Sequence, residues 1–130
     1  MKTDRELMDL AVQAKQNSYS PYSGFPVGAA LMAEDGTVYL GCNIEGASFG
    51  NAICAERTAL CKAVSEGQRS FVKLAVTADT DGPCTPCGIC RQMLLEFAPE
   101  LTVLCGSRAG DITTYTLCEL LPHAFSASDM

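Results

Sequence analysis

The sequence predicts an α/β protein, a three-layer α/β/α sandwich around a mixed sheet of roughly five strands. Two apolar runs joined by a glycine-containing turn predict a β-hairpin between residues 25 and 42. After residue 50, candidate helices and strands alternate, a pattern typical of a sheet covered by helices on both faces. No repeat, low-complexity segment or linker divides the chain, so we expect residues 1–130 to form one domain.

The N-terminal part is predicted to hold one helix and the hairpin. Thr3-x-x-Glu6 is a capping box, and apolar residues at helical spacing then extend the helix to about Gln16. The small residues Gly28-Ala29-Ala30 predict that a helix packs closely on the first strand. The other expected elements are, in chain order, a breaker segment at 20–24, strands at 25–32 and 38–42, and a glycine-rich loop at 43–51.

The C-terminal part is predicted to alternate between helices and strands. A helix from about Cys54 to Ser65 is followed by Gly67, which suits the left-handed position after a helix. The remaining expected elements are a buried strand at 71–78, a turn at 79–85, a helix from Pro86 to about Phe97, a strand at 101–105, a weaker strand at 112–115, and a short helix opened by the capping box Thr116-x-x-Glu119.

Composition excludes several classes of protein. With 48% hydrophobic and 18% charged residues the chain should be globular, and no apolar run is long enough to cross a bilayer. The first residues lack the basic-then-apolar layout of a signal peptide, so we expect a cytoplasmic protein. A net charge of −6 without a basic cluster argues against nucleic acid as a partner and favours a small, uncharged substrate.

The motifs Cys54-Ala-Glu56 and Pro86-Cys87-Gly-Ile-Cys90 predict a catalytic zinc site. Cys87 and Cys90 are three residues apart on one helix face, so both sulfurs can reach a single ion. Zinc held by three protein ligands keeps a fourth position open for water, which distinguishes catalytic from structural sites. Glu56 would not bind metal. It would carry protons between the zinc-bound water and a substrate, whose ring nitrogen and leaving amine would receive them. We therefore expect one Zn²⁺ in each chain.

Three thiolates donate more charge to zinc than three histidines would, so a compensating cation is expected. Arg57, next to Glu56, is the first candidate to hydrogen-bond the thiolates and withdraw charge. Arg91 is the second.

The other cysteines leave one alternative open, a closed structural zinc site with Cys84 as the fourth ligand. Such a site would give no reason for Glu56. The remaining four are expected to be buried small hydrophobic residues rather than parts of a disulfide framework: Cys42, Cys61, Cys105 and Cys118. The single histidine, His123, is expected on the surface.

Taken together, the motifs resemble the small, homotetrameric cytidine deaminases over about residues 19–125. The matching segments are Pro21-Tyr22-Ser23, Phe25 to Leu31, Asn43-Ile44-Glu45, Cys54-Ala55-Glu56-Arg57, Pro86 to Gln92, and Leu121 to Phe125. The resemblance implies a cytidine deaminase-like fold, Cys54, Cys87 and Cys90 as zinc ligands, and Glu56 as the proton carrier.

The same resemblance implies a nucleoside site. Asn43 and Glu45 would bind the ribose hydroxyl, Phe25 would lie against the pyrimidine ring, and Ala55 would also contact substrate. Neighbouring subunits of a homotetramer would complete the pocket with three residues: Ala47, Phe49 and Phe125. Two departures from the family are Gly46, where Asn is common, and Phe49, where Tyr is common.

The reaction implied is hydrolytic deamination of cytidine and 2′-deoxycytidine to uridine and 2′-deoxyuridine with release of ammonia, a step of pyrimidine salvage. Three alternatives stay open. The first is a deaminase of another amino-pyrimidine compound such as blasticidin S, and the second is a deaminase of a base in RNA or DNA. The third is a non-enzymatic structural or interaction domain stabilised by zinc.

Overall fold

The structure, a computed structural model, describes residues 1–48 and 50–130, and its centre is a five-stranded sheet in the order β2-β1-β3-β4-β5. β1 pairs antiparallel with both β2 and β3, β3 pairs parallel with β4, and β4 pairs antiparallel with β5. The mixed sheet predicted from the sequence is confirmed. The strands are β1 Val27–Ala33, β2 Val38–Cys42, β3 Phe71–Ala78, β4 Thr102–Gly106 and β5 Ile112–Thr116.

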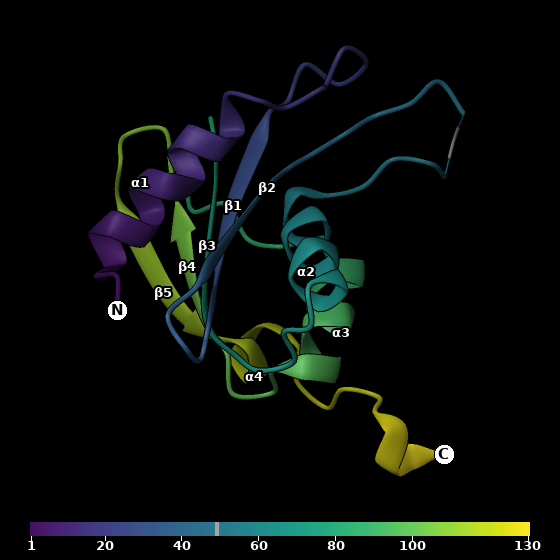
Figure 1. The fold of residues 1–130 in the computed structure, drawn as a ribbon. Coiled ribbons are helices and arrows are strands. Elements are labelled where there is room, and N and C mark those ends of the chain that lie inside the picture. The colour runs from purple at the N-terminus through teal and green to yellow at the C-terminus, as the bar shows by residue number, and fades with distance from the viewer. Residues whose placement is uncertain (49) are drawn as a thin grey trace.

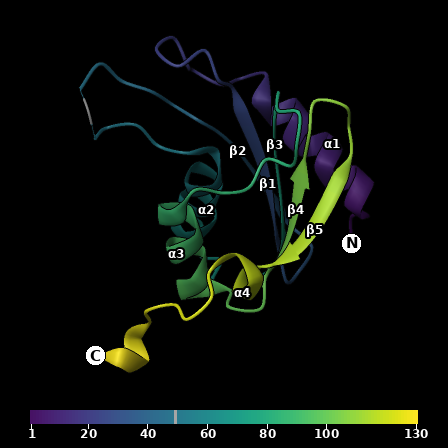
Figure 2. The same ribbon diagram turned by 180° about the vertical axis from the view of Figure 1, so that it is seen from behind.

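Helices cover both faces of this sheet, so the predicted three-layer sandwich is also confirmed. Helix α1 (Asp4–Lys15) lies on one face, while α2 (Ala55–Ser65) and α3 (Gly88–Phe97) lie on the other (Figure 1). The view from behind shows the same division (Figure 2). Each face buries its own apolar cluster, one built around Leu7 and the other around Leu60.

The element boundaries follow local signals in the sequence. The Thr3 side chain accepts a hydrogen bond from the Glu6 backbone N–H at 3.2 Å, and both capping boxes form as predicted. Gly67 has φ +98°, the left-handed conformation expected after α2. Several boundaries differ from the prediction by one or two residues. Helices α2 and α3 begin at Ala55 and Gly88, because Cys54 and Cys87 are their extended N-caps. β1 begins two residues later than expected, and β1, β4 and β5 each end one residue later.

Two glycines let helices approach the hairpin closely. A Cβ at Gly28 would lie 2.0 Å from the Ala11 carbonyl oxygen of α1. A Cβ at Gly41 would lie 2.3 Å from the Ala55 carbonyl oxygen of α2. Close helix packing on the first strand is confirmed, and the same device on β2 sets the height of the first turn of α2 above the sheet.

The C-terminal segment leaves the sandwich after the short helix α4 (Leu117–Leu120) and ends in the 3₁₀ helix η1 (Ala127–Asp129) (Figure 1). His123 is exposed, as expected. Within the described part of the chain, no helix is long and apolar enough to cross a membrane.

The expectation for the four remaining cysteines is wrong in two cases. Cys105 is buried and Cys42 half-buried, but Cys61 and Cys118 are exposed. Cys61 follows the buried Leu60 on α2 and points away from the sheet, because successive helical residues turn to different sides. Cys118 follows the buried Leu117 on α4 and faces solvent for the same reason.

Candidate active site

The register of the sheet brings the loops of the site together at one end of the strands. Val27 pairs with Ala78 and Gly28 pairs with Cys42, so β1 begins where β2 and β3 end. The loops that leave β2 and β3 therefore start side by side and lead into α2 and α3. Ligands of α/β sheets commonly bind outside the carboxyl ends of strands.

Three cysteine sulfurs meet in front of these helices. The Cys54 and Cys87 Sγ atoms are 3.5 Å apart, and the Cys87 and Cys90 Sγ atoms are 3.4 Å apart. All three lie within 4.8 Å of one another and form the one group of potential metal ligands found among the described residues. Cys54 and Cys87 are the N-cap residues of α2 and α3, so two helix N-termini face the cluster.

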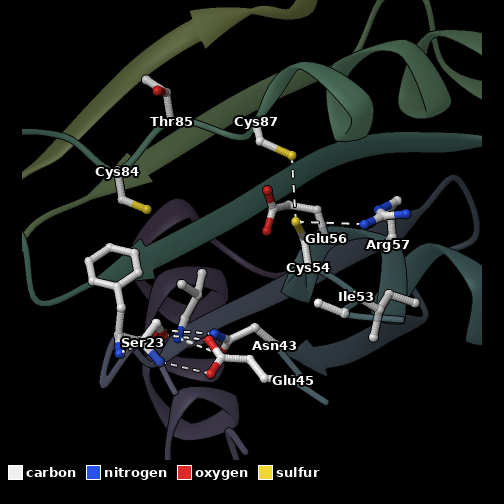
Figure 3. Close-up of a pocket in the computed structure, with 13 residues that line it drawn as sticks. Ser23, Asn43, Glu45, Ile53, Cys54, Glu56, Arg57, Cys84, Thr85 and Cys87 are labelled. Atoms are coloured by element: carbon white, nitrogen blue, oxygen red, sulfur yellow. Dashed lines mark hydrogen bonds between the residues drawn. The ribbon is translucent and has the colours of Figure 1, made fainter. Parts of the chain in front are cut away.

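The cluster fits a zinc ion. Zinc–sulfur bonds of about 2.3 Å at tetrahedral angles place neighbouring sulfurs about 3.8 Å apart, close to the separations here. Cys84 does not belong to the group; it lines the adjoining pocket, and its sulfur lies apart from those of Cys54 and Cys87 (Figure 3). The arrangement is thus a three-sulfur site with room for a further ligand.

Burial and hydrogen bonding affect the thiols differently. Burial raises the pKa of Cys54 and of Cys90 above the ordinary thiol value. Burial also opposes ionisation of Cys87, but hydrogen bonds from the Cys90 backbone and from the two neighbouring thiols hold the pKa of Cys87 below its ordinary value. Hydrogen bonding at the start of α3 therefore favours the thiolate at Cys87. A cation in the cluster would supply the remaining stabilisation. Cys84, with a pKa raised to about 12 by burial, stays a neutral thiol.

Glu56 is a buried carboxyl beside the sulfurs. It is 4% exposed, on the first turn of α2, and its carboxyl group points toward the Cys54 and Cys87 side of the pocket (Figure 3). Burial raises its pKa above the ordinary value. A carboxylate in this environment is a stronger base than an exposed one, a property suited to general acid–base catalysis.

Arg57 is the arginine that contacts the sulfur cluster. One terminal nitrogen donates to Cys54 Sγ at 3.9 Å, and its buried Nε has no hydrogen-bond partner in the part of the chain described. Arg91 instead donates to the carbonyl oxygens of Pro86, at 2.7 Å, and Leu120, at 2.6 Å. Arg91 therefore ties the loop before α3 to the end of α4.

A pocket of about 350 Å³ opens beside the cluster, within the range of roughly 300–1,000 Å³ found for ligand sites. It has two walls on opposite sides (Figure 3). The helix wall consists of Cys54, Glu56, Arg57 and Cys87. The loop wall consists of Ser23, Phe25, Asn43 and Glu45. The sequence analysis gave no role to Ser23, Val27, Ile53 or Thr85, which line the pocket; only Ser23 and Val27 lie in segments that match the family.

On the loop wall, Asn43 and Glu45 both bind neighbouring backbone. Asn43 Nδ2 donates to the Phe25 carbonyl oxygen at 2.8 Å, and Asn43 Oδ1 accepts from the Val27 N–H at 2.9 Å. Glu45 Oε1 accepts from the backbone N–H groups of Tyr22, at 3.1 Å, and Ser23, at 3.0 Å. Counting the described residues, one N–H of Asn43 has no partner and the Glu45 carboxylate has unused lone pairs, so both can still bind a ligand.

Three further residues assigned to substrate, Ala55, Ala47 and Phe125, do not line this pocket. Ala55 is fully buried and packs in the core, so only its backbone can contact a ligand. Ala47 is exposed in a neighbouring depression, and Phe125 is exposed on the C-terminal segment, where its carbonyl oxygen accepts from Gln92 Nε2 at 2.8 Å. Phe49 lies outside the described residues.

Comparison with known proteins agrees with this geometry. A model of the cytidine and deoxycytidylate deaminase zinc-binding region matches residues 1–106. The chain belongs to this deaminase family. A cytidine deaminase from Sporosarcina psychrophila is 55% identical over 119 residues, covering 91% of this chain and 88% of that protein. Another from Halalkalibacterium halodurans is 54% identical over 129 residues, covering 98% of each.

Solved structures of the family share the fold. The crystal structure of cytidine deaminase from Burkholderia pseudomallei superposes with a TM-score of 0.93 at 45% identity, covering 95% of this chain and 100% of that one. The Mycobacterium tuberculosis cytidine deaminase gives a TM-score of 0.83 at 37% identity, covering 96% and 99%. The resemblance inferred from the sequence motifs, to a zinc-binding cytidine deaminase, is confirmed.

Proposed function

We propose that this deaminase hydrolyses cytidine and 2′-deoxycytidine to uridine and 2′-deoxyuridine, with release of ammonia, as a step of pyrimidine salvage. The observation that carries the proposal is the buried Glu56 carboxyl placed between a three-sulfur cluster and a pocket of nucleoside size. The two related cytidine deaminases support the same substrate for this chain. We take residues 1–130 as one catalytic domain acting in the cytoplasm.

In this proposal Cys54, Cys87 and Cys90 hold one Zn²⁺ per subunit. When bound, zinc supplies the Lewis acidity that makes water a nucleophile near neutral pH. The thiolates fix the position of the ion at the ends of two packed helices. Arg57 donates to sulfur and so withdraws part of the thiolate charge, which would otherwise weaken that Lewis acidity.

Glu56 performs the proton transfers. Water adds at C4 of the pyrimidine, Glu56 takes a proton from that water and delivers one to N3, and a second proton passes to the departing amine. Burial raises the pKa of the Glu56 carboxyl, which makes its carboxylate a stronger base than an exposed one for taking the proton from water. Exclusion of solvent around Glu56 also protects these transfers from bulk water.

The loop wall recognises the rest of the nucleoside. Phe25 offers an aromatic face to the pyrimidine, and the free lone pairs of Glu45 and the free N–H of Asn43 would bind the ribose hydroxyl. Polar groups placed to pair with a sugar hydroxyl disfavour ligands without one, because the groups are then left unpaired. Ala55 would contribute only its backbone.

We further propose that the pocket is completed in a homotetramer. Phe25 is 42% exposed and Phe125 is 60% exposed, and Tyr22 is also exposed near the mouth of the pocket. Large apolar side chains of this kind commonly mark an interface. In this arrangement, Ala47, Phe49 and Phe125 come from neighbouring subunits.

The test is ultraviolet absorbance of a substrate panel with the zinc-loaded protein. Cytidine and 2′-deoxycytidine should lose absorbance as ammonia accumulates, while blasticidin S and single-stranded DNA should not react. Turnover of blasticidin S but not of the nucleosides would overturn the substrate assignment.

A further inference from the structure

Ser23 connects two residues of the loop wall. Its hydroxyl donates to Glu45 Oε2, while the same oxygen accepts from the Phe25 backbone N–H at 3.0 Å. The Phe25 N–H occupies a lone pair of the hydroxyl, so the Ser23 hydrogen is directed at the carboxylate. A single side chain thus sets the orientation of an acidic group that faces the pocket.

The backbone around Ser23 strengthens this arrangement. Glu45 Oε1 accepts from the N–H groups of Ser23 and Tyr22, so both carboxylate oxygens are held from one side. These hydrogen bonds, first from the Ser23 side chain, then from the Ser23 backbone and from Tyr22, hold the pKa of Glu45 below its usual range. The carboxylate is therefore ionised and oriented before any substrate arrives.

Without these bonds Glu45 would be poorly fixed. Glu45 lies in a loop, not in a helix or strand, and its side chain does not pack in either apolar cluster. Ordering a long side chain when a ligand binds costs free energy that a preoriented side chain avoids. The helix wall does not share these contacts, because Ser23 lies across the pocket from Glu56 (Figure 3).

We propose that Ser23 is a positioning residue for sugar recognition, acting through Glu45 by fixing its carboxylate toward the ribose hydroxyl. This inference rests on the proposed function. Because the chemical step takes place at the opposite wall, loss of the Ser23 hydroxyl should weaken substrate binding and leave the proton transfers intact.

The test compares Ser23→Ala, Ser23→Thr and the unmodified chain with cytidine. Ser23→Ala should raise KM about ten-fold, as expected for loss of a charge-assisted hydrogen bond, with kcat within about two-fold. Ser23→Thr keeps the hydroxyl at an exposed position and should restore KM to within about three-fold of the original. Ser65→Ala is the matched control, because its hydroxyl donates to the Lys62 carbonyl oxygen on α2; it should change neither constant.

A double-mutant cycle with Glu45→Ala shows whether Ser23 acts through that carboxylate. In the Glu45→Ala background, adding Ser23→Ala should change KM by less than about two-fold. An undiminished ten-fold effect there, or a fall in kcat at constant KM, would overturn the inference while the proposed function stands. An unmodified chain that does not deaminate cytidine would overturn both.

Discussion

The two walls of the pocket are built in different ways. The helix wall stands on the first turns of α2 and α3, where Glu56 and Cys90 are buried and the neighbouring Ala55 and Ala59 are fully enclosed. The loop wall has no such support: Ser23 and Phe25 are exposed, and hydrogen bonds between loops hold it. Groups that need fixed geometry for chemistry thus lie on packed helices, and groups that recognise the ligand lie on loops.

This difference has a consequence for mutations. Changes at the helix wall should abolish the reaction or disturb the fold, because the expected metal ligands and the Glu56 carboxyl lie on helices that pack in the core. Changes at the loop wall should mainly affect substrate binding.

Removal of one sulfur should have the largest effect. Cys87→Ala leaves two sulfurs, which we expect to reduce zinc from about one ion per chain to near zero and to reduce deamination below detection. Metal content by atomic emission and cytidine turnover are the measurements. Cys61→Ala, an exposed cysteine on α2, is the control and should keep both. Full zinc content and turnover in Cys87→Ala would exclude Cys87 as a ligand.

A methyl group beneath α2 should disturb the helix wall from the core side. In Gly41→Ala the new Cβ would collide with the Ala55 carbonyl oxygen at 2.3 Å and the Ala59 nitrogen at 2.6 Å. Overpacking of this kind costs about 2–3 kcal/mol, so the denaturation midpoint should fall and turnover should fall with it. Gly82→Ala meets no atom within 4 Å and should behave like the original chain. Equal stability of the two variants would contradict this prediction and show that α2 shifts to accommodate the methyl group at little cost.

Loss of the Arg57 side chain should have an intermediate effect. We expect Arg57→Ala to lower kcat about ten-fold while most zinc stays bound, because the ligands remain but their charge is no longer offset. Steady-state kinetics and metal content measure the two parts. Arg69→Ala, which removes an exposed arginine beyond the other end of α2, should leave both unchanged. Unaltered turnover in Arg57→Ala would show that the reaction does not need charge compensation by Arg57.

The smallest effect concerns the acid sensitivity of the loop wall. The folded pKa of Glu45 lies below its ordinary value of 4.5, so the ionised carboxylate stabilises the fold above that value, and the contribution is lost as pH falls through the folded pKa. The melting temperature of the original chain should therefore exceed that of Glu45→Gln at neutral pH, and the difference should shrink on acidification. A difference that stays constant from pH 7 to pH 3 would contradict this linkage.

The sequence predicted most of the helix wall because its signals are local. Cys54, Glu56, Cys87 and Cys90 lie in short motifs at helix starts, and helical geometry alone brings neighbouring side chains of one motif together. The capping boxes and the hairpin follow from equally short patterns. The strand order could not be obtained this way, because the parallel pairing of β3 with β4 depends on tertiary packing.

The loop wall was predicted only in part, because its contacts join distant residues. The Ser23–Glu45 bonds span 22 positions, and no pattern in either segment encodes them. The amide of Asn43 also proved to bind the Phe25 and Val27 backbone, a use that depends on the path of two loops. The exposure of Cys61 was not predicted, because free cysteines are usually but not always buried.

We infer that metal binding and proton transfer are separate tasks of the helix wall. The decisive variant is Glu56→Gln, with zinc content and cytidine absorbance measured beside the unmodified protein. We expect equal zinc in both and a loss of turnover in the variant of about 10²–10⁴-fold or more, because an amide cannot carry the protons. Turnover in Glu56→Gln within ten-fold of the unmodified protein would contradict the account and remove Glu56 from the mechanism.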